Sequence, residues 1–471
     1  MLLFAVLLLA SGACAVDWNV TTPLDEYVHS DDGYFEYDVI EEYDEGDHML
    51  YVLNMTSQMW QNETLTTAPV WWHYLAIFVP TDASPPTPGE GRMARMAEFT
   101  RRVGVVSALL MMIPNQPIIF VDDPVIRIED SIIGYTWKIL VEDEGEDEDL
   151  DRSLNLLFPM TKAAKRALDT VEEFVPTVSD LAPTQFMATG YSKRGWTTWL
   201  LGATDQRVFA MAPTVFDLLG MYENLHHHHR SFGGWSWAFL PYWNEDVARY
   251  LNHPRFQLLA EDVDAINYNE RLTMPKMLIL AGNDQFFPSS GSHYFFDELA
   301  EPKFMCMWEN DDHSLGDHQD EIDRNLEAFF TAARTGFDFP EVKWERTNDE
   351  EGGTLVLTGD EPLSVVGWML DTTNKTCEEE RDACRRDTRF RALNGLTDNE
   401  FDLYDVEDLD GSYRLHFPTR DEDGYRVFFM DMTYPGPEDL ELRFTTEVNF
   451  VQDDFPFPRC ETEEECHGIL V

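Results

Sequence analysis

The chain has 471 residues, with 88 acidic and 34 basic side chains and a formal net charge of −54. Hydrophobic residues make up 44% of it and aromatic residues 13%, which is enough for a large packed core and excludes a globally disordered chain. The charge excludes most nucleic-acid binders, because a surface this negative repels phosphates, and it disfavours anionic membranes. The length is typical of about two to three domains.

The first predicted element is a secretory leader over residues 1–15. An apolar run covers 2–10, and Ala13 and Ala15 supply the small-residue pattern of a cleavage site. The run is shorter than the roughly 20 apolar residues that span a membrane, and no later stretch reaches that length. We therefore expect a secreted, extracellular protein without a membrane span.

Sequons and cysteines agree with an oxidising, extracellular compartment. The predicted glycosylation sites are Asn19, Asn54, Asn62 and Asn374. The simplest disulfide connectivity pairs close neighbours, Cys377 with Cys384 and Cys460 with Cys466. Cys306, in an apolar run, is then expected to be a buried free thiol. The spacing of the close pairs does not fit zinc ligands.

Alternating strands and helices follow an acidic, partly β segment at 16–65. The predicted strands are 70–80, 105–113, 185–189, 209–215, 277–281 and 303–308, and the predicted helices are 92–103, 160–175, 192–203, 292–299 and 318–335. This order predicts an α/β domain over 66–336, with a mostly parallel sheet covered by helices. An aromatic insertion around 220–260 is expected to form a lid. The acidic stretch 142–151 lacks calcium-loop spacing and is predicted to be a solvated loop.

Helical periodicity disappears after residue 337. Short alternating runs separated by Gly, Pro, Asn and Asp take over, at 354–358, 363–368, 412–417, 424–431 and 440–451. This pattern predicts a smaller, β-sandwich-like C-terminal domain over 337–471.

The strongest chemical signal is an apolar strand that runs through Gly190 and Ser192 directly into a helix. This is the setting of a nucleophile elbow, in which a strained turn lifts the serine hydroxyl above the sheet. Arg194 stands where the usual G-x-S-x-G motif has its second glycine. The competing interpretation of Ser192 is an ordinary helix N-cap.

A serine nucleophile needs a base and a group that orients the base. Asp284 follows the strand 277–281, and His313 follows the strand 303–308. Their order after Ser192 is that of α/β-hydrolases, and each lies past a strand end. Asp217 is an alternative acid and His318 an alternative base. The backbone N–H of Lys193 and one from Asn115 or Gln116 are predicted to form the oxyanion hole.

The run 226–229 consists of four histidines, but consecutive residues of a helix point in different directions, which disfavours a metal site. We expect a polar lid there, no metal and no cofactor. The aromatic residues that follow are expected to pack as a lid core or a pocket wall: Trp235, Trp237, Phe239, Tyr242 and Trp243.

From residues 71 to 451 the chain resembles the PhoPQ-activated pathogenicity-related family, which includes secreted bacterial proteins and an autocrine proliferation repressor of a social amoeba. The matching pieces are 114–117, 134–137, 159–164, 192–199, 271–276, 284–288 and 310–315, with looser matches at 386–390, 424–430 and 444–448. The resemblance implies an α/β-hydrolase core similar to serine peptidases and esterases, with Ser192, Asp284 and His313 as the triad. The chain departs from the family at Gln285, where Glu is usual, and is one residue shorter before Pro288.

Two hypotheses about function remain open at this point. The first is a secreted serine hydrolase that acts on a small-molecule or peptide substrate. The second is a secreted signalling or binding protein on a hydrolase scaffold, with a partner at the cell surface, because fold does not settle function.

Overall fold

A computed structural model describes residues 2–7, 21–81, 91–372, 385–389, 399–420 and 424–471. Its contacts divide the chain into two compact units. Unit 1 comprises Met1–Thr214 and Pro254–Lys276, and unit 2 comprises Val215–His253 and Met277–Val471. The predicted boundaries at 65/66 and 336/337 therefore fall inside unit 1 and unit 2, respectively. Among the described residues, no helix combines the length and hydropathy needed to cross a bilayer.

Unit 1 is built on a mixed sheet. Its strands lie in the order β2 (Glu36–Asp44), β3 (His48–Met59), β4 (Val70–Pro80), β5 (Ser107–Leu110), β1 (Leu2–Leu7), β8 (Gln185–Tyr191) and β9 (Val208–Thr214). The β8–β9 pair is parallel, and the other pairs are antiparallel. Strand β1 belongs to the predicted leader, whose removal stays a prediction. A separate hairpin consists of β6 (Ile118–Phe120) and β7 (Asp123–Arg127).

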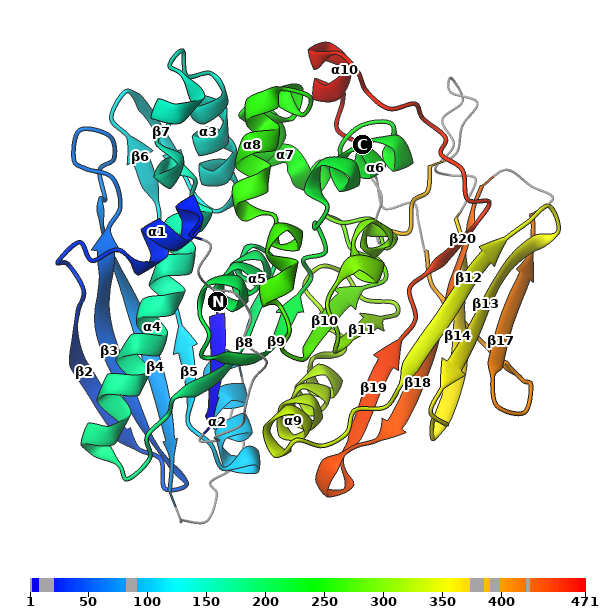
Figure 1. Cartoon of the computed structure of the whole chain (residues 1–471), viewed down its shortest axis with the longest axis horizontal. Helices are drawn as coiled ribbons and strands as arrows, with labels where there is room; N and C mark the ends of the chain where they lie inside the picture. Colours follow the sequence, from blue (N-terminus) through cyan, green and yellow to red (C-terminus); the bar gives the residue numbers. More distant parts are fainter. Residues whose placement is uncertain (1, 8–20, 82–90, 373–384, 390–398, 421–423) are drawn as a thin grey trace. The chain divides into compact units, whose positions relative to one another are not determined.

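The helices of unit 1 are α1 (Pro23–His29), α2 (Arg92–Val103), α3 (Asp130–Val141), α4 (Leu157–Val178), α5 (Lys193–Thr204) and α8 (Pro254–Val263). The sequence pattern did not predict α1, α3 or α8. Helix α4 lies along β3 and β4 (Figure 1) and is longer than the predicted 160–175. Helix α1 was predicted as extended chain. It forms because Thr22 and Asp25 make a capping box and Pro23 occupies its first turn.

Two sheets organise unit 2. The larger has the order β10 (Lys276–Ala281), β11 (Lys303–Trp308), β19 (Glu441–Thr445), β18 (Arg426–Pro435), β14 (Ser364–Asp371) and β15 (Asp402–Tyr404), with β20 (Asn449–Val451) paired to β18. The smaller has the order β12 (Val342–Asn348), β13 (Gly352–Gly359), β17 (Tyr413–Pro418) and β16 (Glu407–Asp408).

The two sheets of unit 2 pack face to face, which gives the β-sandwich-like region expected after residue 337 (Figure 1). The rings of Phe417 and Phe428 lie 5.0 Å apart across the interface. At Gly367 a Cβ atom would come within 2.8 Å of Leu415. The larger sheet does not stop at the predicted boundary, because Met305 of β11 pairs with Thr445 of β19.

Helices and short 3-10 turns complete unit 2. They are α6 (Met221–Phe232), η3 (Trp237–Phe239), α7 (Leu240–Asn244), η4 (Val247–Tyr250), η6 (Gly291–Tyr294), η7 (Phe296–Glu298), α9 (Gln319–Thr335), η9 (Pro437–Asp439) and α10 (Glu463–His467). The helix predicted over 292–299 is replaced by the turns η6 and η7. Phe295 separates them with φ −153°, and both Phe295 and Phe296 are buried.

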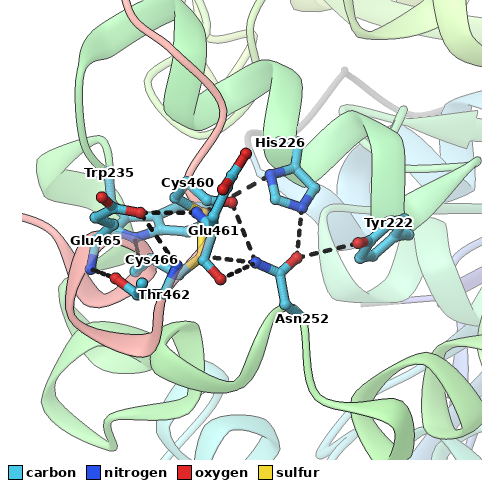
Figure 2. The surroundings of a disulfide bond; sticks show 9 residues. All are labelled: Tyr222, His226, Trp235, Asn252, Cys460, Glu461, Thr462, Glu465 and Cys466. Atoms are coloured by element: carbon cyan, nitrogen blue, oxygen red, sulfur yellow. Dashed lines mark hydrogen bonds between the residues drawn. A yellow bond between two sulfur atoms is a disulfide. The ribbon is translucent and has the colours of Figure 1, made fainter.

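The disulfide between Cys460 and Cys466, with an S–S distance of 2.15 Å, confirms one predicted pair. Figure 2 shows how it is held: Trp235 Nε1 donates to the carbonyl of Cys466 at 2.8 Å, and Asn252 Nδ2 donates to that of Cys460 at 3.1 Å. Cys377 and Cys384 lie outside the described residues. Cys306 is a buried free thiol, as predicted, and burial raises its pKa to about 12.

Candidate active site

Ser192 sits on the turn between β8 and α5 in unit 1, with φ 57° and ψ −124°. A positive φ is costly for a residue with a Cβ and is typical of a nucleophile elbow. The turn is fixed by the Ser192 N–H, which donates to the carbonyl of Thr214 at 2.9 Å. At Gly190 a Cβ would lie 2.5 Å from the carbonyl oxygen of Arg194, so only glycine fits there. Ser192 remains half-buried rather than sealed in the core.

An ionic cluster that sequence reasoning missed surrounds this elbow. Glu129 pairs with both cationic residues after Ser192: its carboxylate accepts two hydrogen bonds of 2.7 Å from Arg194 and lies 3.1 Å from Lys193 Nζ. Asp130 accepts a further bond of 3.0 Å from Lys193 Nζ. These cations hold the pKa of Glu129 at about 2 despite the opposing effect of burial. The signal in the sequence is only an acidic pair before a helix, more than 60 residues from its partners.

The predicted oxyanion loop is tied to the same cluster. Gln116 donates to the Glu129 carboxylate and accepts from the Glu129 N–H, both at 2.7 Å. Arg194 Nε also donates to the carbonyl of Ile113 at 2.8 Å. Asn115 is buried, and its Nδ2 donates to the carbonyl of Trp72. These bonds hold both side-chain amides in place, and a backbone N–H of Asn115 or Gln116 stays the predicted second donor of the oxyanion hole.

A buried histidine, His73, lies behind this loop. Its Nδ1 bonds to the carbonyl of Met112 and its Nε2 to the hydroxyl of Ser57, both at 2.9 Å. Burial lowers the pKa of His73 to about 4, so the ring is neutral near pH 7, with Nδ1 donating and Nε2 accepting. His73 therefore fixes the start of the oxyanion loop and is too deeply buried to act on a substrate.

Asp284 and His313 form a bonded pair in unit 2. His313 Nδ1 lies 2.7 Å from one carboxylate oxygen of Asp284 and 3.0 Å from the other. The backbone N–H groups of Phe286 and Phe287 donate to the same carboxylate and fix its orientation. Among the described residues, His313 Nε2 has no hydrogen-bond partner. This is the arrangement of a general base whose outer nitrogen is free to take a proton.

Gln285 holds the two loops of this pair together. Its side-chain carbonyl accepts from the N–H of His313 at 3.0 Å, and its NH₂ donates to Asp312 at 3.1 Å. Its backbone carbonyl accepts from the hydroxyl of Ser236, which also accepts from Arg389 at 3.0 Å. Although the family resemblance implies Glu at this position, Gln285 leaves the carboxylate of Asp284 bonded to His313.

The alternative acid and base lie in different surroundings. Burial and the nearby Asp284 raise the pKa of Asp217 well above its usual value, which disfavours the charged form of its carboxyl. His318 pairs with Asp311 at 3.0 Å, and this bond raises its pKa. His318 is thus also bonded to an aspartate, but its Nε2 lies 3.8 Å from Glu309 Oε1, whereas His313 Nε2 has no such neighbour among the described residues.

The four histidines of α6 are all buried. Three of them have separate partners: Asn252 for His226, Ser290 for His227 and the Ser236 N–H for His228. Among the aromatic residues after α6, Trp235 stacks on Phe239 at 5.8 Å. Phe239 contacts Phe286, whose ring lies 4.4 Å from that of His313. Phe239 therefore connects Trp235 to the rings beside His313, whereas Trp237 is 39% exposed and does not pack as predicted.

Two of the predicted glycosylation sites, Asn54 on β3 and Asn62 after it, are exposed. Asn19 and Asn374 lie outside the described residues. Use of all four sequons stays a prediction.

Comparison with known proteins identifies the family. The pattern of the PhoPQ-activated pathogenicity-related proteins matches residues 24–382. The chain belongs to the PhoPQ-activated pathogenicity-related family. A relative from Dictyostelium discoideum, autocrine proliferation repressor protein A, is 33% identical over 98% of this chain and 96% of its own length.

Solved structures similar to this family member include esterases. An acetyl xylan esterase from Paenibacillus sp. R4 is 13% identical over 65% of this chain and 92% of its own, with a TM-score of 0.43. An acetyl xylan esterase from Thermoanaerobacterium sp. is 13% identical over 64% and 92%, with a TM-score of 0.39. The predicted α/β core with a β-rich C-terminal region is confirmed by the order of strands and helices, but the sheet is mixed rather than mostly parallel, because five of the six described strand pairs of the unit 1 sheet are antiparallel.

Proposed function

We propose that this protein is a secreted serine hydrolase, an esterase or a peptidase, in which Ser192, His313 and Asp284 act as the catalytic triad. The observation that carries the proposal is the strained backbone of Ser192 at a strand-to-helix turn. The bonded Asp284–His313 pair supplies the other two groups in the chain order of α/β-hydrolases.

In the proposed mechanism, His313 Nε2 removes the proton of the Ser192 hydroxyl as the oxygen attacks the carbonyl carbon of the substrate. Asp284 holds Nδ1 and stabilises the imidazolium that forms. The backbone N–H of Lys193, in the first turn of α5, stabilises the oxyanion. His313 then donates its proton to the leaving group, and a water molecule, activated by His313, hydrolyses the acyl-enzyme.

The second candidate is a signalling protein that retains the scaffold, acting through a cell-surface partner. It is favoured by the likeness to a relative named as a proliferation repressor. The two candidates differ in whether the Ser192 hydroxyl is reactive.

A fluorophosphonate probe on the secreted protein tests the proposal. We expect labelling of the wild type, loss of labelling in Ser192→Ala, and full labelling in Ser364→Ala, a control at an exposed serine of β14. Asp284→Asn should retain the fold and lower kcat by about 10³–10⁴. A folded wild-type protein that takes no label would refute the hydrolase and favour the scaffold candidate.

A further inference from the structure

A buried ion pair in unit 2 has no part in the mechanism proposed above. Arg389 is 2% exposed and Asp387 is 1% exposed. The pair is forked: Arg389 Nε lies 2.8 Å from one carboxylate oxygen of Asp387, and Nη2 lies 2.6 Å from the other. Because the desolvation of two charges offsets much of their attraction, a pair this buried is a weak source of stability. The other bonds of Arg389 are therefore more informative about its role.

Those bonds hold the segment that contains Ser236. Arg389 Nη1 donates to the Ser236 hydroxyl oxygen at 3.0 Å and to the carbonyl of Val471 at 2.9 Å. The Val471 N–H donates to the carbonyl of Trp235 at 2.8 Å, so residue 471 is also tied to this segment. The Ser236 N–H is taken up by His228 Nε2 at 3.0 Å. Ser236 is thus fixed on both sides, and its hydroxyl proton is left to be donated elsewhere.

The Ser236 hydroxyl donates to the residue that follows the candidate acid. Its acceptor is the backbone carbonyl of Gln285. The Gln285 side-chain carbonyl accepts in turn from the N–H of His313 at 3.0 Å. Ser236 therefore fixes the backbone between Asp284 and the side chain that holds the loop of the base.

The residue before the candidate acid is held by the same part of the chain. Asn283 is fully buried, and its Nδ2 donates to the carbonyls of Thr388 at 2.6 Å and Asn399 at 2.8 Å. Thr388 immediately precedes Arg389 in the chain. Both neighbours of Asp284 are thus bonded either to the segment 387–389 or to a hydroxyl that Arg389 binds.

We propose that Arg389 is a positioning residue for the Asp284–His313 pair and acts through Ser236 and Gln285; this inference rests on the proposed function. The cation polarises the Ser236 hydroxyl and so strengthens its bond to the Gln285 carbonyl. A buried, fully bonded network has few alternative arrangements. It keeps the Asp284 carboxylate directed at His313 Nδ1 while the imidazole gains and loses its proton.

The first variant that tests this path is Ser236→Ala, which removes only the hydroxyl between Arg389 and Gln285. Its matched control is Ser292→Ala. Ser292 is also fully buried in unit 2, and its hydroxyl donates to Glu447 at 2.9 Å rather than to the loops of the acid and the base. The two variants therefore lose a buried hydroxyl and one donated bond each.

The second variant is Arg389→Met/Asp387→Asn, which removes both charges together, so that neither is left buried without its partner. Its control is Arg426→Met/Asp371→Asn. That pair is also forked, with distances of 2.8 and 2.9 Å, and joins β18 to β14. Chemical denaturation verifies that each variant folds.

Nuclear magnetic resonance of isotope-labelled histidine follows the imidazole of His313 without any turnover, with His313→Gln to assign its signal. We expect the midpoint of the His313 titration to fall by about half a unit to one unit in Ser236→Ala and in the Arg389 variant, because a less well directed carboxylate stabilises the imidazolium less. In the hydrolysis of p-nitrophenyl acetate, kcat should fall about tenfold with KM unchanged. Both controls should keep the wild-type midpoint and kcat.

An unchanged midpoint in both variants, or an equal shift in the controls, would overturn the proposal. A shift in only one of the two variants would break the path between Arg389 and Ser236 and would also overturn it. The titration separates this inference from the proposed function. If the wild type hydrolyses no ester and takes no fluorophosphonate label, the hydrolase is refuted, and the midpoints still decide whether Arg389 positions the Asp284–His313 pair.

Discussion

Gln285 uses both ends of its side-chain amide at the candidate base. It accepts from the N–H of His313 and donates to the carboxylate of Asp312. A carboxylate at this position could accept the first bond but could not donate the second, and it would face Asp312 as a like charge. An amide is therefore the group that satisfies both partners without adding charge beside His313.

Replacement of Gln285 by the family residue should be visible in the pH profile. In Gln285→Glu the added negative charge stabilises the protonated base, so the acid limb of the kcat/KM profile should move to higher pH by about one unit. Activity should then fall more at pH 6 than at pH 8. The control is Gln257→Glu on α8, which adds the same charge elsewhere. An equal shift in the control, or none in Gln285→Glu, would show that Gln285 does not act on the base.

At the scale of elements, the turn between β8 and α5 depends on close backbone approach. The Arg194 side chain is directed to Glu129 and to the carbonyl of Ile113, so the turn tolerates a large residue where the usual motif has glycine. Gly190 cannot be replaced in the same way, because the Arg194 carbonyl occupies the space that a Cβ at position 190 would need.

Gly190→Ala should lower the free energy of unfolding by about 2–4 kcal/mol or displace the elbow and abolish labelling of Ser192. Chemical denaturation and probe labelling measure the two effects. Gly316→Ala is the control, since a Cβ there meets only the Ser314 hydroxyl at 3.3 Å. A Gly190→Ala protein with wild-type stability and labelling would contradict the geometry of the turn.

The sequence predicted the elements that its hydrophobic periodicity marks clearly. It missed those that depend on partners far apart in the chain or on a helix cap. The strand-elbow-helix at Ser192 was predicted because strand, small residues and helix are contiguous. The pairing of Asp284 with His313 was predicted from chain order. Glu129 could not be placed, because its cationic partners lie in a different helix. Helix α1 was missed because its signal is a capping box rather than a long apolar stripe.

At the scale of the whole molecule, stability should depend on histidines that are buried and neutral. Burial lowers the pKa of His73 and of His226 to about 4, and those of His227, His228 and His293 well below the usual range. In the unfolded chain these rings take up a proton near pH 6.5. The stability that they contribute is therefore complete above that pH and is lost as the pH falls below it, down to about 4 for His73 and His226.

His73→Gln isolates one of these contributions from the titration of the many carboxylates. The variant should be less stable than the wild type at pH 7.5, and the difference should shrink by about 2 kcal/mol at pH 5, because only the wild type must keep a buried ring neutral. Urea denaturation at the two pH values measures this. His416→Gln, at an exposed histidine of β17, should show no such change. A difference that is the same at both pH values would mean that His73 is not buried in its neutral form.

A crystal structure of the secreted protein after reaction with a fluorophosphonate tests the triad most directly. The account predicts phosphorus bonded to Ser192 Oγ, with His313 Nε2 within about 3 Å of an oxygen on the adduct and Asp284 still on Nδ1. Phosphorus on another residue, or an imidazole of His313 that faces away from the modified serine, would contradict it.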